Sequence, residues 1–148
     1  MRKVLVVVDY QNDFVDGSLG FNQSESIAGN IYALVAKAVK NGDLVVFTKD
    51  THYEDYLSTR EGIFLPVEHC IKGTKGHQLY GELKVFDLPE KCFVGENLEE
   101  IKQNEKKMYD IAIKMAKTDE QRKNIQKDYE ARANFVKEMS KESQVERK

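Results

Sequence analysis

The amino-acid composition changes sharply near Gly95, and this change restricts how the chain can fold. All nine glycines, both prolines, all three histidines and both cysteines lie within residues 1–95. Residues 96–148 contain none of these residue types, and 25 of these 53 residues are charged, 13 basic and 12 acidic. We therefore predict two regions of different kinds, an α/β domain over residues 1–95 and a charged helical extension over residues 96–148.

Short apolar runs in the first region predict strands. Residues 4–8 are continuously apolar and mostly β-branched, which indicates a central strand covered on both faces of a parallel sheet. Residues 44–48 form a second run of this kind, and residues 92–94 form a weaker third. The fold class is therefore predicted to be α/β.

A helix is predicted between the first two strands. Asn22 and Glu25 have the spacing of a capping box, and Asn41-Gly42 supplies a left-handed stop. Between them, apolar residues recur on one helical face: Ile27, Ile31, Leu34, Val35, Ala38 and Val39. The order strand, helix, strand makes a βαβ unit, whose crossover is expected to be right-handed.

Residues 96–148 have helical periodicity. Asn97 with Glu100 and Thr118 with Gln121 are capping-box pairs, and the second pair indicates a break or kink. Apolar residues recur on both sides of Thr118: Ile101, Met108, Ile111, Ala112 and Met115 before it, and Ile125, Tyr129, Ala133, Val136 and Met139 after it. We expect one long helix or a two-helix hairpin. Its thin apolar stripe must pack against the α/β part or another copy of the chain.

Length, hydropathy and charge exclude several classes of protein. The chain has 148 residues, about the size of one domain. No apolar run approaches the roughly 18 residues that span a bilayer, so we expect no membrane role. The formal net charge is −2, and the charges of residues 96–148 nearly cancel, so we expect no nucleic-acid binding.

The N-terminus and the cysteines predict a cytoplasmic protein. The apolar run at residues 4–8 is shorter than the roughly 7 to 15 residues of a signal peptide's apolar region. Cys70 and Cys92 are too few for a disulfide framework and are expected to be free thiols in a reducing compartment.

Polar residues follow the predicted strands at their carboxyl ends, where open α/β sheets bind ligands. Asp9, directly after the first strand, could act as a general base or cap the loop through nearby backbone amides. Asp50 and His52 lie two residues apart after the second strand, so on extended chain they project to the same side. With His69 they form an Asp-His-His set of the kind that holds zinc, iron or manganese. Histidines on polar loops otherwise form ordinary hydrogen bonds.

Three ordered motifs in residues 1–95 resemble the isochorismatase-like cysteine hydrolases, with the closest likeness to the nicotinamidase-related amidases. The motifs are Asp9-Tyr10-Gln11-Asn12-Asp13-Phe14 with Gly17-Ser18-Leu19, then Lys49-Asp50-Thr51-His52, then Pro66-Val67-Glu68-His69-Cys70 with Gly73-Thr74 and Gly76. The resemblance implies a Rossmann-like three-layer parallel sheet and an Asp-Lys-Cys triad that forms an acyl-enzyme thioester from a small amide.

The resemblance also assigns roles to individual residues. Asp9 matches the triad aspartate, and Asp50, His52 and His69 match the ligands of a divalent metal, for which zinc is the first expectation and iron or manganese the alternatives. In nicotinamidases this metal contacts the pyridine nitrogen of the substrate. Phe14 matches an aromatic residue that packs against the substrate ring.

The sequence departs from the family pattern after the third predicted strand. No residue matches the catalytic lysine or the catalytic cysteine, and the charged helix begins at once, so the sheet is predicted to be truncated there. Cys70 adjoins a predicted metal ligand and is either a substitute nucleophile or a small buried residue. In the family strand order 3-2-1-4-5-6, truncation leaves the edge of residues 4–8 open. Either a second copy pairs there in a homo-oligomer, or the chain is a marginal product of truncation and frameshift or fusion.

Two functions follow from these patterns. The first is a metal-binding cysteine hydrolase, an amidase that acts on nicotinamide or a similar small amide. The alternative is a catalytically inactive metal-binding or oligomerisation module with a helical interaction tail.

Overall fold

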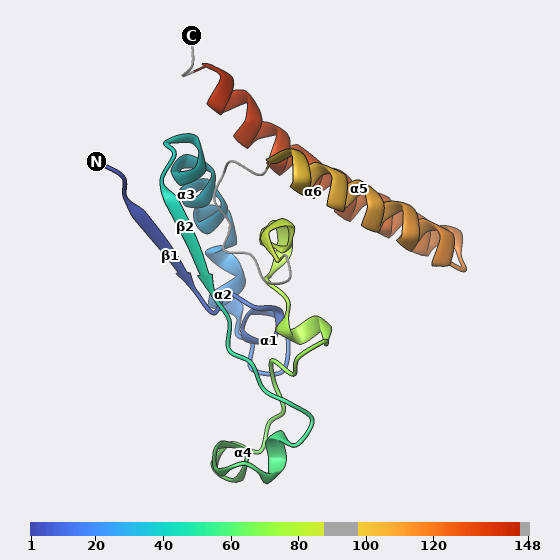
Figure 1. The fold of residues 1–148 in the computed structure, drawn as a ribbon. Helices are drawn as coiled ribbons and strands as arrows, with labels where there is room; N and C mark the ends of the chain where they lie inside the picture. Colours follow the sequence, from blue (N-terminus) through green and yellow to red (C-terminus); the bar gives the residue numbers. More distant parts are fainter. Residues whose placement is uncertain (88–97, 146–148) are drawn as a thin grey trace.

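The computed structural model describes residues 1–87 and 98–145. A two-stranded sheet lies beside one long helix, and loops with short helices extend from the carboxyl end of the sheet (Figure 1). A pair of long helices, α5 and α6, crosses the other end of the molecule. No helix in the described ranges has the length and apolar character needed to cross a membrane.

The sheet consists of β1 (Val4–Val8) and β2 (Leu44–Thr48), which confirms the bounds of both predicted strands. The strands are parallel, with Val4 opposite Leu44 and Val8 opposite Thr48. The α/β class is therefore confirmed. The third strand predicted at residues 92–94 lies outside the described residues.

The prediction that β1 is covered on both faces is wrong for the described part of the chain. Val7 is buried, but Val4, Val6 and Val8 are 60%, 50% and 68% exposed. Residues alternate between the faces of a strand, so one face of β1 packs inward and the other is open. β1 is thus an edge strand of the described sheet, and a continuous valine run did not distinguish this from a central position.

The predicted helix between the strands is two helices, α2 (Asn22–Ser26) and α3 (Ala28–Lys40), that meet at Ile27. The predicted Asn22–Glu25 capping box does not form, because Asn22 is already the first helical residue and Phe21 is the N-cap. The hydroxyl of Ser24 donates to the Phe21 carbonyl at 2.5 Å instead. At the other end Gly42 has a φ of 72°, which confirms the left-handed stop.

Short helices and turns make up the rest of residues 9–87. They are α1 (Asn12–Val15), the 3-10 turn η1 (Tyr56–Ser58), α4 (Arg60–Phe64), and the 3-10 turns η2 (Lys75–His77) and η3 (Gly81–Phe86). They carry the residues that follow both strands, so most candidate site residues lie on this irregular part of the fold.

The C-terminal region is a helical hairpin of α5 (Leu98–Met115) and α6 (Asp119–Val145). The predicted Thr118–Gln121 capping box forms between them: the Gln121 N–H donates to Thr118 Oγ1 at 3.1 Å, and the Thr118 N–H donates to Gln121 Oε1 at 3.2 Å. This box separates the helices, so the hairpin is the correct one of the two predicted alternatives. The other predicted pair includes Asn97, which lies outside the described residues.

The hairpin packs on the α/β part, and the two regions share one hydrophobic core. The ring of Phe135 on α6 lies 5.9 Å from Tyr32 on α3 and 6.0 Å from Phe86 on η3. The core joins residues from both regions: Val35, Val39, Leu83, Val85 and Phe86 with Ile101, Val136 and Met139. The region boundary near residue 95 lies outside the described residues and stays a prediction.

Candidate metal centre

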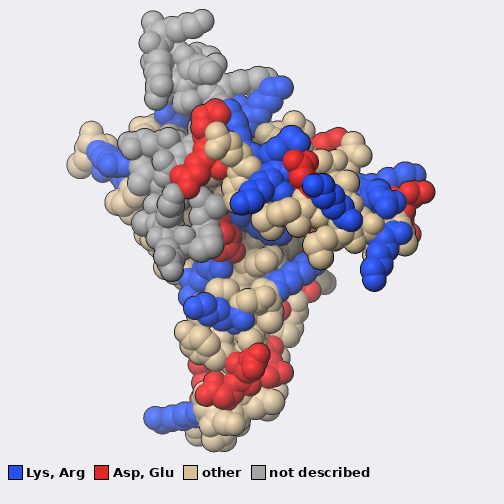
Figure 2. Space-filling model, turned by 45° about the vertical axis from the view of Figure 1, so that its right-hand side comes forward, with Lys and Arg blue, Asp and Glu red and all other residues tan. Residues whose placement is uncertain are grey.

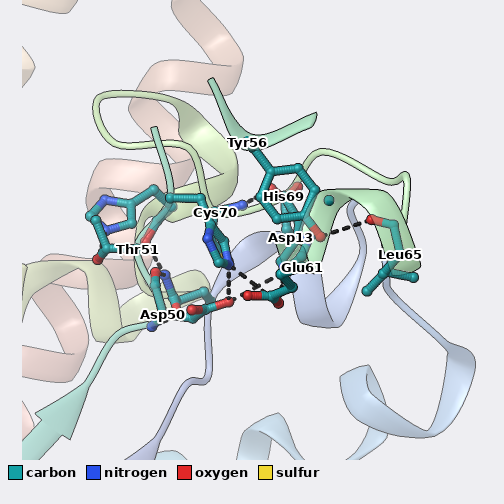
Figure 3. Close-up of polar contacts among 12 residues, drawn as sticks. Asp13, Asp50, Thr51, Tyr56, Glu61, Leu65, His69 and Cys70 are labelled. Carbon is teal, nitrogen blue, oxygen red and sulfur yellow. Dashed lines mark hydrogen bonds and ion pairs between the residues drawn. The ribbon is translucent and has the colours of Figure 1, made fainter. Parts of the chain in front are cut away.

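Three side chains predicted as metal ligands converge at the end of β2. The Nε2 atoms of His52 and His69 lie 3.0 Å and 3.3 Å from the same carboxylate oxygen, Oδ2 of Asp50 (Figure 3). One ligand atom from each of the three residues lies within 4.8 Å of those of the other two. The structure therefore brings together two imidazole nitrogens and one carboxylate oxygen.

Backbone pairing sets the two histidines side by side. The His52 N–H donates to the Cys70 carbonyl at 2.9 Å, and the Lys72 N–H donates to the His52 carbonyl at 2.8 Å. These bonds join the loop after β2 to the loop that carries His69, and the two imidazole rings lie 4.7 Å apart. Histidines 17 positions apart in the sequence thus become neighbours.

A hydrogen bond to backbone holds the His69 ring in its orientation. Its Nδ1 lies 2.7 Å from the Val67 carbonyl and donates to it, which directs Nε2 at Asp50. The residue is 2% exposed. The buried Tyr56 ring lies 5.1 Å from His69 and 4.7 Å from His52, and its hydroxyl donates to the Leu65 carbonyl at 2.8 Å.

Glu61 is a fourth polar residue at this cluster, and the sequence analysis missed it. Its Oε1 lies 3.7 Å from His52 Nε2 and 4.0 Å from His69 Nε2. Glu61 stands in the first turn of α4, whose N-cap Thr59 accepts a hydrogen bond from the Gly62 N–H at 3.1 Å. The capped turn was readable from sequence, but its position beside the histidines depends on the loop fold.

The fully buried Gln11 holds Asp50 in place through its backbone. Gln11 Nε2 donates to the carbonyls of Asp50 and His77 at 2.9 Å and 2.8 Å, and its Oε1 accepts from the Asp50 N–H at 2.8 Å. Every polar atom of this amide side chain is directed at backbone that follows β2 or lies in η2. Gln11 is therefore a positioning residue for the cluster.

Asp13 holds the loop that carries His69 in place, also through a hydrogen bond to backbone. Its Oδ2 accepts from the Cys70 N–H at 2.8 Å, directly after His69. Gly76 packs against this carboxylate so closely that a Cβ there would collide with it. The sequence analysis found Gln11 and Asp13 only as parts of a motif, because their partners lie 39 to 66 positions away.

The structure places Asp9 at the carboxyl end of β1, as predicted. Its φ of 50° is unusual for a residue with a side chain, and its half-buried carboxylate accepts from the Thr48 hydroxyl at 2.6 Å. The Asp9 N–H donates to the Thr48 carbonyl at 3.2 Å. The Asp9 carboxylate is thus bound to the last residue of β2, while the Asp9 carbonyl accepts from the Gln11 N–H of its own loop at 2.9 Å.

Phe14 on α1 lies at the edge of the cluster. Its half-buried ring is 5.6 Å from the His69 ring, at 58° to it. An apolar aromatic surface therefore adjoins the histidines on one side.

Cys70 is not arranged as a nucleophile. It is fully buried, and burial together with the carboxylates of Asp50, Asp13 and Asp9 raises the pKa of its thiol to about 12. A protonated thiol is a poor nucleophile, so of the two predictions for Cys70 the structure favours a small buried residue. Lys49, which opposes this shift, pairs with Asp87 at 2.8 Å. Cys92 lies outside the described residues.

Acidic side chains surround the outer end of this region. Figure 2 shows Asp and Glu gathered where α4 and its flanking loops lie, in a segment with exposed Glu54, Asp55, Glu61 and Glu68. Such a group of carboxylates creates a negative local potential, which attracts cations.

The fold and the polar cluster agree with one family of proteins. The chain matches the isochorismatase domain over residues 3–107, so it belongs to the isochorismatase family, as its motifs indicated. Among curated proteins it is 41% identical over 87 residues to the uncharacterized isochorismatase family protein PncA of Bacillus subtilis, covering 56% of this chain and 46% of that protein. It is 33% identical over 108 residues to the nicotinamidase of Saccharomyces cerevisiae, covering 55% of this chain and 50% of that protein.

The chain is also similar in fold to a solved structure of a related protein. The crystal structure of the nicotinamidase/pyrazinamidase PncA from Bacillus subtilis aligns with a TM-score of 0.53 at 30% sequence identity, covering 70% of this chain and 66% of that one. The chain spans about half the length of the curated relatives it matches.

Proposed function

We propose that Asp50, His52 and His69 bind a divalent metal ion and that the chain acts on a small aromatic amide, as an amidase of the isochorismatase family. The observation that carries the proposal is the convergence of two Nε2 atoms on Asp50 Oδ2, at 3.0 Å and 3.3 Å.

The residues fit a metal ion by their chemistry. Two imidazoles and one carboxylate suit zinc, and also iron or manganese, and three protein ligands leave coordination positions open. The hydrogen bond from His69 Nδ1 to the Val67 carbonyl is the outer-shell contact that commonly orients a ligating histidine. A bound divalent ion would supply Lewis-acid chemistry and a contact for a ring nitrogen of the substrate.

Phe14 supports the substrate class. A planar aromatic amide could lie on its ring while polar atoms of the same molecule face the cluster, because Phe14 and His69 are neighbours. The yeast and Bacillus relatives are named for amidase activity on nicotinamide and pyrazinamide, both small aromatic amides.

Asp9 is the proposed general base. A carboxylate at the tip of a strand can take a proton from an attacking nucleophile, and its bond from Thr48 fixes one oxygen while the residue stays half-buried. The nucleophile itself has no candidate among the described residues, because the Cys70 thiol is buried and protonated.

The lack of a nucleophile among the described residues favours a second candidate. This candidate is a catalytically inactive metal-binding module in which the helical hairpin is an interaction element. Both candidates require the metal site, and they differ only in turnover. Ammonia release and metal binding measured on the same protein therefore separate them.

The experiment uses the full chain with nicotinamide and zinc, iron or manganese, and measures ammonia and metal affinity. Metal-dependent ammonia release that is lost in Asp9→Ala and reduced in Phe14→Ala would support the amidase, with the exposed Asp16→Ala as a matched control. Metal binding without ammonia would support the inactive module. Release that survives Asp9→Ala contradicts the assigned base, and the absence of metal binding contradicts both candidates.

A further inference from the structure

A cavity of about 380 Å³ lies between the α5–α6 hairpin and the loops that follow β2. Its lining joins Lys49, Thr74 and His77 of the α/β part to Asn104 on α5 and Arg132 on α6. In Figure 1, the yellow-green turn η3 lies between the hairpin and these loops. Cavities of this volume bind small molecules in many proteins.

Three cationic side chains line this cavity, each from a different part of the fold. Lys49 follows β2, Lys84 lies in η3, and Arg132 lies in α6. The lining contains two carboxylates, those of Asp87 and Glu105, so the ionised side chains leave an excess of one positive charge. Such an excess attracts an anion.

Both carboxylates are already bound to groups of the protein. The Asp87 Oδ1 lies 2.8 Å from the Nζ of Lys49, and its Oδ2 accepts from the Leu79 N–H at 2.9 Å. The buried Glu105 accepts from the Nε of Arg132 at 2.8 Å. The two carboxylates therefore hold Lys49 and Arg132 in place at the wall of the cavity.

Several hydrogen-bond donors at this wall are available to a ligand. The two terminal nitrogens of Arg132 and the ammonium of Lys84 have no hydrogen bond to any described residue. The side-chain amides of Gln78 and Asn104 also line the cavity, and neither has such a bond within the described ranges. Lys84 and Arg132 border a second cavity as well, of about 260 Å³, so solvent reaches them from two sides.

We propose that this cavity binds a phosphate group, either free phosphate or a small phosphate monoester, through Arg132, Lys84 and Lys49. A phosphate dianion accepts hydrogen bonds from several directions, which suits cations that come from three elements. A planar carboxylate is matched by a single guanidinium, and Glu105 already occupies the Nε of Arg132. The site is separate from the candidate metal ligands, none of which lines the cavity.

The surroundings of His77 support an anion site. Its ring borders the cavity, and its Nε2 lies 2.8 Å from the Thr51 hydroxyl. Burial lowers the pKa of this imidazole, and the largest effect of a neighbouring charge comes from Lys49, which lowers the pKa further. The imidazole is thus neutral at pH 7, in a place where a further positive charge is disfavoured.

Calorimetric titration and imidazole NMR of the metal-free full chain test the proposal, because without a metal ion phosphate cannot bind through one. Inorganic phosphate or ribose 5-phosphate should bind with a Kd below about 1 mM and shift the His77 signals. Tighter binding of ribose 5-phosphate would identify a phosphate monoester site, and tighter binding of inorganic phosphate a site for the free ion. No binding of either at about 10 mM, or shifts confined to His52 and His69, overturns the proposal.

A charge reversal locates the site. Lys84→Glu should weaken phosphate binding at least about 5-fold, because it replaces attraction by repulsion at the cavity wall. Lys127→Glu makes the same change at an exposed position of α6 that lines neither cavity, and it should weaken binding less than about 2-fold. Equal weakening by the two variants overturns the proposal.

The Arg132 contact needs a paired substitution, because Arg132→Gln alone leaves the buried Glu105 without its partner. Arg132→Gln combined with Glu105→Gln keeps both residues polar and neutral. Phosphate affinity should fall at least about 10-fold in this double variant. His52→Ala should leave phosphate affinity unchanged, so a failure of the metal site and a failure of this site are distinguishable. Unchanged phosphate affinity in a folded double variant overturns the proposal.

Discussion

The loops that follow β2 and the α5–α6 hairpin are held in place by different kinds of contact. The loops have little regular structure, yet the buried Gln11 amide and the half-buried Asp13 carboxylate bind their backbone at specific points. The hairpin is almost entirely helical, and it joins the core through a few apolar side chains such as Phe135 and Met139. Hydrogen bonds to backbone are directional and hold loops that have little regular structure, whereas the hairpin is positioned by apolar packing.

This difference explains where a precise site can form. The loops cannot shift without breaking these hydrogen bonds, whereas the hairpin makes apolar contacts with the core that have no fixed direction. The candidate ligands all lie in the loops. Substitutions in the loops should therefore change metal binding, and substitutions in the hairpin should change stability alone.

The largest effect that we expect is slow alkylation of Cys70, which is buried among the loops. Since the pKa of this buried thiol is raised from about 9 to about 12, its thiolate fraction at pH 8 should be about 1,000-fold below that of an ordinary thiol. Iodoacetamide should label Cys70 in Cys92→Ser protein at least that much more slowly before unfolding in urea than after it. Equal labelling rates would mean that the loops are open to water.

The same shift has a consequence for stability at high pH. The folded-state pKa lies above the unfolded one, so the protonated Cys70 stabilises the fold fully below about pH 9. This contribution is lost as the pH rises from about 9 toward 12. The Cys70→Ser variant should show a shallower loss of unfolding free energy over that window in urea titrations.

A core substitution on the hairpin should have the next largest effect. Met139 on α6 is fully buried, and its replacement by alanine should lower the unfolding free energy by about 2 to 5 kcal/mol. Metal affinity should stay within about 2-fold of the parent wherever the variant is folded. Met115→Ala, at a 74% exposed site on α5, is the control and should change stability by less than about 0.5 kcal/mol. A marked loss of metal affinity in Met139→Ala would show that the hairpin also positions the site.

The sequence predicted the features that depend on nearby residues. The bounds of β1 and β2 and the Thr118–Gln121 capping box are local patterns, and each is confirmed. Asp50 and His52 share a side because they are two residues apart on extended chain. The exposure of β1 and the break at Ile27 could not be predicted, because both depend on which elements pack against the chain.

The contacts that site residues make with residues far away in the sequence could not be predicted either. Glu61 approaches the histidines only because η1 and α4 fold back over them. Gln11 reaches Asp50 and His77 because the loop after β1 lies between the other two loops. Such contacts follow from tertiary structure, and a motif gives only the residue types.

Removing the Gln11 amide tests whether polar contacts to backbone hold the metal ligands in place. Gln11→Ala leaves two carbonyls and the Asp50 N–H without a partner, which should cost about 1 to 3 kcal/mol of stability. Metal affinity should fall about 10- to 100-fold, as is typical for loss of an outer-shell contact. The exposed Gln23→Ala on α2 provides the matched control. Unchanged metal affinity in a folded Gln11→Ala protein would contradict its positioning role.

The smallest expected effect is at the turn of the hairpin. Thr118→Ala removes the hydroxyl that accepts from the Gln121 N–H, which should lower stability by about 0.5 to 2 kcal/mol. Thr118→Ser retains the hydroxyl acceptor and should keep most of this stability. Metal affinity should not change in either variant, and a change in it would contradict the separation between hairpin and site.

Asp50, His52 and His69 are proposed to share one metal ion. X-ray absorption on zinc-loaded full-length protein measures this most directly, with His52→Ala and His69→Ala as comparisons. We expect two imidazole nitrogens and a carboxylate oxygen at about 2.0 to 2.2 Å, with one imidazole lost in each variant. A zinc shell without histidine, or one that is the same in both variants, would contradict it.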